Sequence, residues 1–157
     1  MAIDNFEYFD GPLQDVGILS IDSPGDSTCE PLGIVSITIK NFGAVSEVNI
    51  PVSFQVDAGV VINEVIAGPV AAGASAQYTF TTPAPLPAGA HTITCTVAPV
   101  GDMDPTNDTA MTSTVTTATI ISYPYNQDFE TTNDWTAAGL NSSWAFGTPA
   151  KTTIIGA

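Results

Sequence analysis

The chain has 157 residues, 44% of them hydrophobic, and a formal net charge of −14 at pH 7. Its only basic side chains besides one histidine are Lys40 and Lys151, so it lacks the cationic surface that nucleic acid or an anionic membrane requires. The hydrophobic fraction is sufficient for a core, and the length favours one domain with pieces of its neighbours. No run of about 18 apolar residues indicates a transmembrane helix.

The chain begins with a short strand-like run at 2–9 that ends at an Asp-Gly-Pro turn at 10–12. We expect residues 1–12 to be the closing strand of a preceding domain or a linker. The central region alternates apolar and polar residues as half-buried strands do, most clearly at 33–40. The expected strands are 15–21, 33–40, 50–56, 60–66, 76–80, 91–97 and 109–115.

About seven strands in about a hundred residues, with turn residues between them, predict an immunoglobulin-like fold. The expected fold class is therefore all-β, an antiparallel β-sandwich at 13–118 with partial segments of other domains at both ends. Cys95 shares the apolar phase of its strand and is expected in the core, whereas Cys29 lies in a loop. A disulfide between Cys29 and Cys95 and a pair of unlinked thiols are both open alternatives.

The composition changes after residue 117. Both tryptophans, Trp135 and Trp144, and a second cluster of aromatic residues fall in this last part of the chain. The segment is too short to build a core without help. We therefore expect 119–157 to be a linker followed by the truncated start of a second domain.

Five short segments carry a resemblance to a known family. They are 15–18 (DVGI), 38–43 (TIKNFG), 50–52 (IPV), 89–93 (GAHTI) and 107–109 (NDT). Through them the central region resembles the CARDB-like, immunoglobulin-type modules of bacterial surface proteins.

The two ends resemble a second family. The segments 127–130 (QDFE) and 143–149 (SWAFGTP), with Trp135 between them, look like the opening of a MAM-like jelly-roll domain. The segment 2–6 (AIDNF) is similar to the closing strand of the same domain type. Together these resemblances imply a window from a repeating array in a large secreted protein of the Bacteroidota, such as a cell-surface adhesin or a gliding-associated filament exported by the type IX route.

An acidic turn is the first candidate site. Asp102, Asp104, Asn107 and Asp108 place four oxygen-bearing side chains within seven residues, and Ca²⁺ binds six to eight oxygens in such loops. The turn lacks the glycine and distal glutamate of an EF-hand loop. The alternative is an ordinary turn in which Asp and Asn side chains bond to their own backbone. The MAM-like resemblance implies a second cation site at Asp4, Asp128 and Glu130, which requires ends from different molecules or a longer parent chain.

Exposed aromatic residues in jelly rolls often bind sugars, so Trp135 and Trp144 are candidate carbohydrate-binding residues; the alternative is that they fill a domain core. No catalytic arrangement stands out. His91 has no cysteine or serine partner at a recognisable spacing, and there is no Gly-x-Ser-x-Gly nucleophile elbow. The sequence therefore predicts a protein that is not an enzyme.

The predicted function is that of a structural or adhesive module on the cell surface, whose partners are neighbouring copies or domains of the same protein. Its unfinished ends favour head-to-tail assembly into filaments by strand exchange, with Ile3, Phe6, Phe129 and Trp144 as the assembly residues. The alternative is a ligand-binding module of an adhesin that binds surface glycans or depends on calcium.

Overall fold

The computed structural model describes residues 11–119, and residues 1–10 and 120–157 lie outside the described part. Ten strands and no helix occupy the described residues. The strands are β1 (Val16–Ser23), β2 (Ser27–Thr28), β3 (Leu32–Gly33), β4 (Ser36–Asn41), β5 (Ile50–Val56), β6 (Ile62–Ile66), β7 (Ser75–Thr79), β8 (Ala84–Pro85), β9 (Gly89–Val97) and β10 (Thr109–Thr116). All seven predicted strands are present, and the three added strands β2, β3 and β8 are two residues long.

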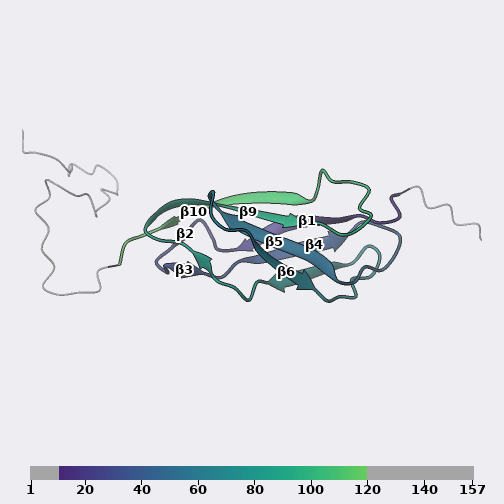
Figure 1. Ribbon diagram of the computed structural model, residues 1–157, viewed down its shortest axis with the longest axis horizontal. Coiled ribbons are helices and arrows are strands. Elements are labelled where there is room, and N and C mark those ends of the chain that lie inside the picture. The colour runs from purple at the N-terminus through teal and green to yellow at the C-terminus, as the bar shows by residue number, and fades with distance from the viewer. Residues whose placement is uncertain (1–10, 120–157) are drawn as a thin grey trace, which may run out of the picture. The chain divides into compact units, whose positions relative to one another are not determined.

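The strands form a β-sandwich (Figure 1). One sheet has the order β1-β4-β7, the other has the order β2-β10-β9-β5-β6, and β3 pairs with β8 in a small third sheet. The pairs are antiparallel except for β2 and β10, which run parallel. The prediction of an all-β, immunoglobulin-like sandwich is confirmed.

Strand β5 shows why this sequence forms a sandwich. Its apolar residues Ile50, Val52, Phe54 and Val56 are all buried, and the residues between them are half-buried. Successive side chains of a strand point to opposite faces, so one face of β5 packs into the core and the other borders solvent. Pro51 is the second residue of the strand, close to the strand start where a missing N–H is tolerated.

The strand predicted at 33–40 is divided in the structure. Its apolar residues Val35, Ile37 and Ile39 are fully buried, as expected. Gly33, however, belongs to β3 and pairs with Ala84 of β8. A Cβ at Gly33 would meet the side chain of buried Leu86, so the close approach of these two segments needs a glycine.

The two sheets meet through aromatic rings. Phe54 of β5 and Phe80, the residue after β7, make an edge-to-face contact with ring centroids 4.9 Å apart. Tyr78 of β7 makes a similar contact with Phe80 at 5.3 Å. Because β5 and β7 belong to different sheets, these contacts fix the sheets face to face.

The chain enters and leaves this unit at opposite ends of the sandwich (Figure 1). At the entry pole, the start of β1 lies against the loop between β9 and β10, where the Val16 N–H donates to Asp102 at 2.9 Å. At the exit pole, the end of β10 lies against β2, where the Val115 and Thr117 N–H groups donate to the carbonyls of Asp26 and Thr28 at 3.0 and 2.9 Å. β1 and β10 therefore both run from the entry pole to the exit pole.

Several predicted features lie outside the described residues. They are the assembly residues Ile3, Phe6, Phe129 and Trp144, the sugar-binding candidate Trp135, and the second cation site at Asp4, Asp128 and Glu130. The boundaries at 1–12 and 119–157, with their jelly-roll assignment, also stay predictions. Between residues 11 and 119 no helix has the length and apolar character needed to cross a membrane.

Candidate cation site at the acidic turn

The acidic turn connects β9 to β10 at the entry pole, and two of its carboxylates accept hydrogen bonds from backbone N–H groups. Asp102 accepts the Val16 N–H through Oδ2 and the Asp104 N–H through Oδ1, at 2.9 and 2.8 Å. Asp104 Oδ1 accepts the hydroxyl and the N–H of Thr106, which lower the pKa of Asp104. The bonds from the Asp104 and Thr106 N–H groups are those of ordinary Asx turns, whereas the bond from Val16 reaches the turn from the start of β1. The turn alternative therefore accounts for Asp102 Oδ1 and Asp104 Oδ1, whereas Asp102 Oδ2 bonds to a distant part of the chain.

The other two predicted ligands have unsatisfied oxygens. Asn107 donates through Nδ2 to Asp15 Oδ1 at 2.9 Å, but Asn107 Oδ1 is buried and has no hydrogen-bond partner. Asp108 Oδ1 is likewise buried and unpartnered. A buried acceptor without a partner carries its full desolvation cost, so both oxygens favour a cation or a donor beside them.

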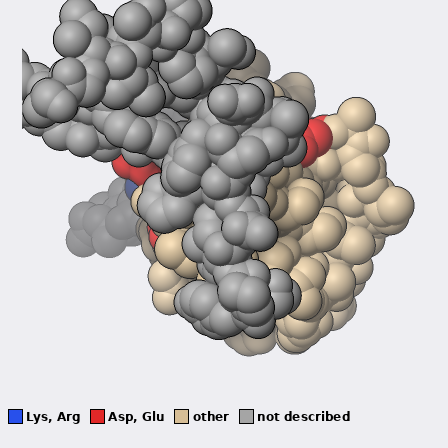
Figure 2. Space-filling view, turned by 90° about the vertical axis from the view of Figure 1, so that its left-hand side faces the viewer, with Lys and Arg blue, Asp and Glu red and all other residues tan. Residues whose placement is uncertain are grey.

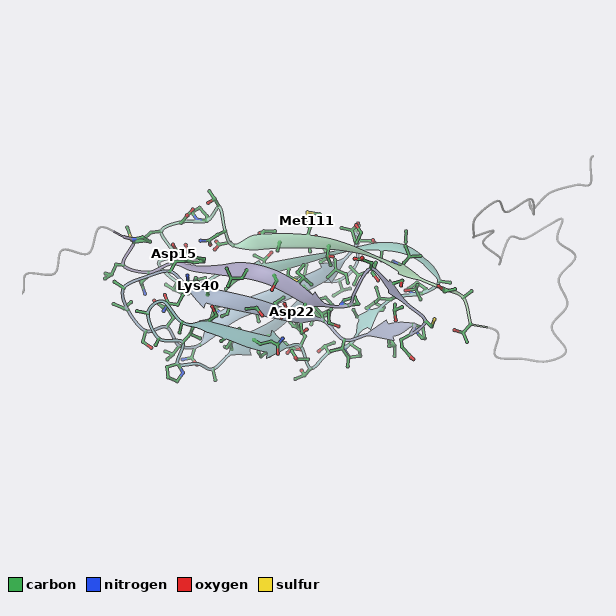
Figure 3. The ribbon with its side chains drawn as sticks, turned by 180° about the vertical axis from the view of Figure 1, so that it is seen from behind. Asp15, Asp22, Lys40 and Met111 are labelled. Carbon is green, nitrogen blue, oxygen red and sulfur yellow. The ribbon has the colours of Figure 1, made fainter. Side chains whose placement is uncertain are left out.

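The electrostatic environment of the turn is strongly negative. Burial, followed by the charges of Asp102, Asp15 and Asp104, raises the pKa of Asp108. Asp15 is only 4% exposed and lies at the entry pole just before β1, as Figure 3 shows. Lys40 is the one lysine of the described residues, and its ammonium lies over the Phe42 ring, 4.8 Å from the centroid. The Lys40 ammonium therefore makes a cation–π contact with Phe42.

Asp15 is the residue of this cluster that sequence reasoning missed. It is 92 positions from Asn107 in the chain, and it reaches the turn because β1 begins beside the loop that precedes β10. The three aspartates of the turn and Asp15 interact electrostatically. Within residues 11–119, however, no group of three or more His, Cys, Asp or Glu side chains is arranged to hold a metal ion. Calcium binding at the turn stays a prediction.

The two cysteines do not form the disulfide that was one of the sequence alternatives. Cys95 is a free thiol that is completely buried on β9. Cys29 is exposed in the loop after β2. The apolar phase of β9 correctly placed Cys95 in the core, and its burial raises the pKa of the thiol to about 12.

Two further polar clusters were not evident from the sequence. Glu64 of β6 accepts hydrogen bonds from Tyr78, Thr81 and Thr82. His91 of β9, which has no partner at a recognisable sequence spacing, contacts Asp57 and the Pro87 carbonyl. The partners of both residues lie on other strands or loops, so residue spacing carries no signal for them.

A shallow groove lies on the five-stranded sheet, with a volume of about 190 Å³. Ligand pockets usually enclose about 300–1,000 Å³. The residues that line this groove are Pro51, Val52, Ser53, Asn63, Glu64, Val65, Thr96 and Ala98. Glu64 is the titratable member of this lining, and its carboxylate is already occupied by hydrogen bonds.

Residues 20–119 match the model of the CARDB family, which is more than half of the chain. The chain belongs to the CARDB family. CARDB domains are small β-sandwich modules without catalytic activity of their own. The CARDB resemblance seen in the sequence is therefore confirmed, whereas the MAM-like ends and the bacterial group stay predictions.

Several solved structures are similar to the chain at low identity. The chain is similar to the CARDB domain of the PF1109 protein from Pyrococcus furiosus, crystallised in complex with di-metal ions: 17% identity, a TM-score of 0.47, and coverage of 70% of this chain and 97% of that one. The solution structure of the same domain has the same identity and TM-score, with 69% and 97% coverage. A β-glucosidase from Listeria innocua in complex with glucose is similar at 15% identity, a TM-score of 0.40, and 66% and 16% coverage. No curated protein matches the sequence.

Proposed function

We propose that this CARDB chain is a load-bearing spacer module of a secreted, repetitive cell-surface protein with a structural or adhesive role. The observation that carries the proposal is the position of the two poles. The chain enters beside the acidic turn and leaves beside β2, at the opposite end of the sandwich (Figure 1). A module with this arrangement separates the domains joined to its two ends by its own length.

The hydrogen bonds near the two ends suit such a role. Tension applied through the ends acts along β1 and β10. The bonds from Ile18 to the Asn107 carbonyl, and from Val115 and Thr117 to the segment around β2, lie across this direction. Bonds loaded in shear share the force and break together, whereas bonds in an unzipping geometry break one after another.

Proline substitution in β10 tests this arrangement. Val115→Pro removes the N–H that donates to the Asp26 carbonyl. This N–H faces away from β9, so proline at this position leaves the hydrogen bonds between β9 and β10 in place. We expect a lower unfolding force in single-molecule stretching of tandem repeats of the full chain. Met111→Pro is the matched control, since strand alternation points its N–H away from β9 toward an edge where no strand pairs with it among the described residues. Equal unfolding forces for Val115→Pro and Met111→Pro would contradict the proposal.

Assembly by strand exchange is the finer form of this proposal. It rests on the apolar ends of the sequence, with Ile3, Phe6, Phe129 and Trp144 as the assembly residues, and on the readiness of unpaired strands to accept a partner. Light scattering after size-exclusion chromatography, run across protein concentration, should show growth for the whole chain and none after deletion of residues 1–10. Equal growth of the truncated chain would count against strand exchange.

Calcium-dependent binding is a second candidate function, favoured by the buried, unpartnered oxygens of Asn107 and Asp108. Calorimetric titration with CaCl₂ should give a binding signal for the whole chain. Asp108→Asn should abolish the signal. Asp26→Asn, which removes one exposed carboxylate at the other pole, should retain it. No signal from the unaltered chain, or equal signals from both variants, would leave the turn as a structural element.

A further inference from the structure

His91 lies near the exit pole, between two hydrogen-bond acceptors. It is the third residue of β9, and its side chain is 9% exposed. Its Nδ1 lies 2.9 Å from Asp57 Oδ2, and its Nε2 lies 2.6 Å from the carbonyl oxygen of Pro87. The ring therefore joins the turn after β5 and the segment before β9 to the strand itself.

Both acceptors are held in place by other bonds. Asp57 Oδ1 accepts the Thr92 N–H at 2.8 Å, and the Asp57 N–H donates to the Thr92 carbonyl at 2.8 Å. Next to Pro87, the fully buried Leu86 donates its N–H to the Pro31 carbonyl at 2.8 Å. Asp57 therefore cannot turn away from the ring without breaking its bond to Thr92, and the Leu86 bond anchors the backbone just before Pro87.

The chemistry of this arrangement depends on protonation. A carboxylate and a carbonyl are acceptors only, and a neutral imidazole has one N–H to donate. In the neutral ring, one nitrogen lone pair would therefore face an oxygen at hydrogen-bond distance. The imidazolium has an N–H on each nitrogen and satisfies both acceptors, with charge assistance from Asp57.

We propose that His91 is a pH-sensitive clamp, which as the imidazolium fastens the β5–β6 turn and the segment before β9 to the exit pole, and which releases one of the two contacts when it loses its proton. Asp57 is the charged group that faces the ring. The residue opposite His91 on β10 is the uncharged Thr114, and Pro87 contributes only its carbonyl.

The direction of the effect follows from linkage. The hydrogen bond to Asp57, followed by that to the Pro87 carbonyl, raises the pKa of His91 above its usual value of 6.5. A group whose pKa is raised by folding stabilises the folded state fully below its unfolded pKa and loses that contribution as the pH rises through its folded pKa. The clamp is therefore closed in mildly acidic solution and opens on the alkaline side of 6.5.

The position of the clamp gives the opening a consequence for the spacer. The start of β9 pairs with the end of β10, with Gly89 opposite Thr116, and the chain leaves the sandwich from that end. Figure 2 views this pole, and most of the described surface in view carries no charge. Loosening of the segment before β9 therefore acts beside the junction that leads to the next part of the chain.

The sequence contains one histidine, so the titration of His91 in the whole chain can be read without assignment. The proton NMR signal of its Cε1–H should titrate at a higher pH in the folded chain than in the same chain unfolded in urea. A folded midpoint equal to or below the unfolded one would overturn the proposal.

Hydrogen exchange provides a second measurement. Corrected for the intrinsic pH dependence of exchange, the amides of segment 57–62 and of segment 86–92 should lose protection between about pH 5.5 and about pH 8.5 in the unaltered chain. His91→Gln should show no such pH-dependent change, since the glutamine side chain does not titrate in this range. Pro87→Ala, which keeps the carbonyl, should behave like the unaltered chain. The proposal would be refuted by an equal loss of protection in His91→Gln, or by no loss in the unaltered chain.

Discussion

Glu64 provides the sharpest test of how the two sheets are held together. It lies on β6 of the five-stranded sheet, and its carboxylate accepts the Tyr78 hydroxyl at 2.7 Å from β7 of the other sheet. The same carboxylate accepts the Thr81 hydroxyl at 2.9 Å and the N–H groups of Thr81 and Thr82, each at 3.0 Å. The perturbation is Glu64→Gln, which keeps the shape of the side chain but replaces an accepting oxygen with a donating amide.

The magnitude follows from the pKa of Glu64. Burial alone would raise this pKa, but the bonds from the Thr81 N–H, the Tyr78 hydroxyl and the other donors lower it from 4.5 to about 2. One pKa unit corresponds to about 1.4 kcal/mol, so the carboxylate stabilises the fold by about 3 kcal/mol at most. Screening by solvent at this half-buried site reduces the expected loss in Glu64→Gln to about 2 kcal/mol at neutral pH.

The sign of the pH dependence is also determined. Folding lowers the pKa of Glu64, so its contribution is present above 4.5 and is lost as the pH falls through about 2. The difference in free energy of unfolding between the unaltered chain and Glu64→Gln should thus be largest at neutral pH and should shrink in acid. Other acidic groups that titrate in acid cancel in this difference.

Urea unfolding followed by far-ultraviolet circular dichroism measures both the loss of free energy of unfolding and its dependence on pH. Glu30→Gln is the matched control, because it makes the same chemical change at an exposed position. Tyr78→Phe removes one of the donors while keeping the ring contact with Phe80, and should cost about 1 kcal/mol. The reasoning is refuted if Glu64→Gln loses no more stability than Glu30→Gln, or if its loss is the same at neutral and acidic pH.

Three further substitutions or modifications test the packing. Gly17→Ala should lower the free energy of unfolding by about 1–3 kcal/mol, because a Cβ there would overlap the Asn107 side chain; an unchanged urea midpoint would contradict this contact. Phe54→Ala should cost about 3–5 kcal/mol by leaving a cavity between the sheets, and a loss below about 1 kcal/mol would place the ring outside the core. A thiol reagent should label exposed Cys29 in the native chain and Cys95 only on unfolding, and rapid native labelling of both would argue against the burial of Cys95.

Much of the fold is predictable from local patterns. The alternation in 50–56 identifies both the strand and its buried face, since the side-chain period of a strand is two. The same argument places Cys95 in the core. It cannot predict β2, β3 and β8, which are two residues long and exist because distant segments happen to lie beside them. The split of the strand predicted at 33–40 has the same origin, since Gly33 pairs with a segment that lies about fifty positions away.

The acidic turn shows where prediction of a site from sequence stops. Spacing alone identifies one cluster, made of Asp102, Asp104, Asn107 and Asp108. It cannot tell which of these side chains bond to the backbone and which keep an oxygen without a partner. The structure shows that the first two bond to the backbone, while the last two retain unpartnered buried oxygens. This division depends on which N–H groups come within reach, and that is settled by how β1 docks on the loop.

The sequence by itself determined the class of this protein: its alternating strands and turn residues specify an all-β sandwich, and five short segments carry its resemblance to the CARDB family. Only the tertiary structure decided which polar groups meet. Asp15 with Asn107, Glu64 with Thr81 and His91 with Asp57 are pairs whose members come from different strands or loops. The physical reason is that a period of two records which side of a strand is buried, whereas the neighbour of that strand is set by sheet order and register, to which every strand contributes.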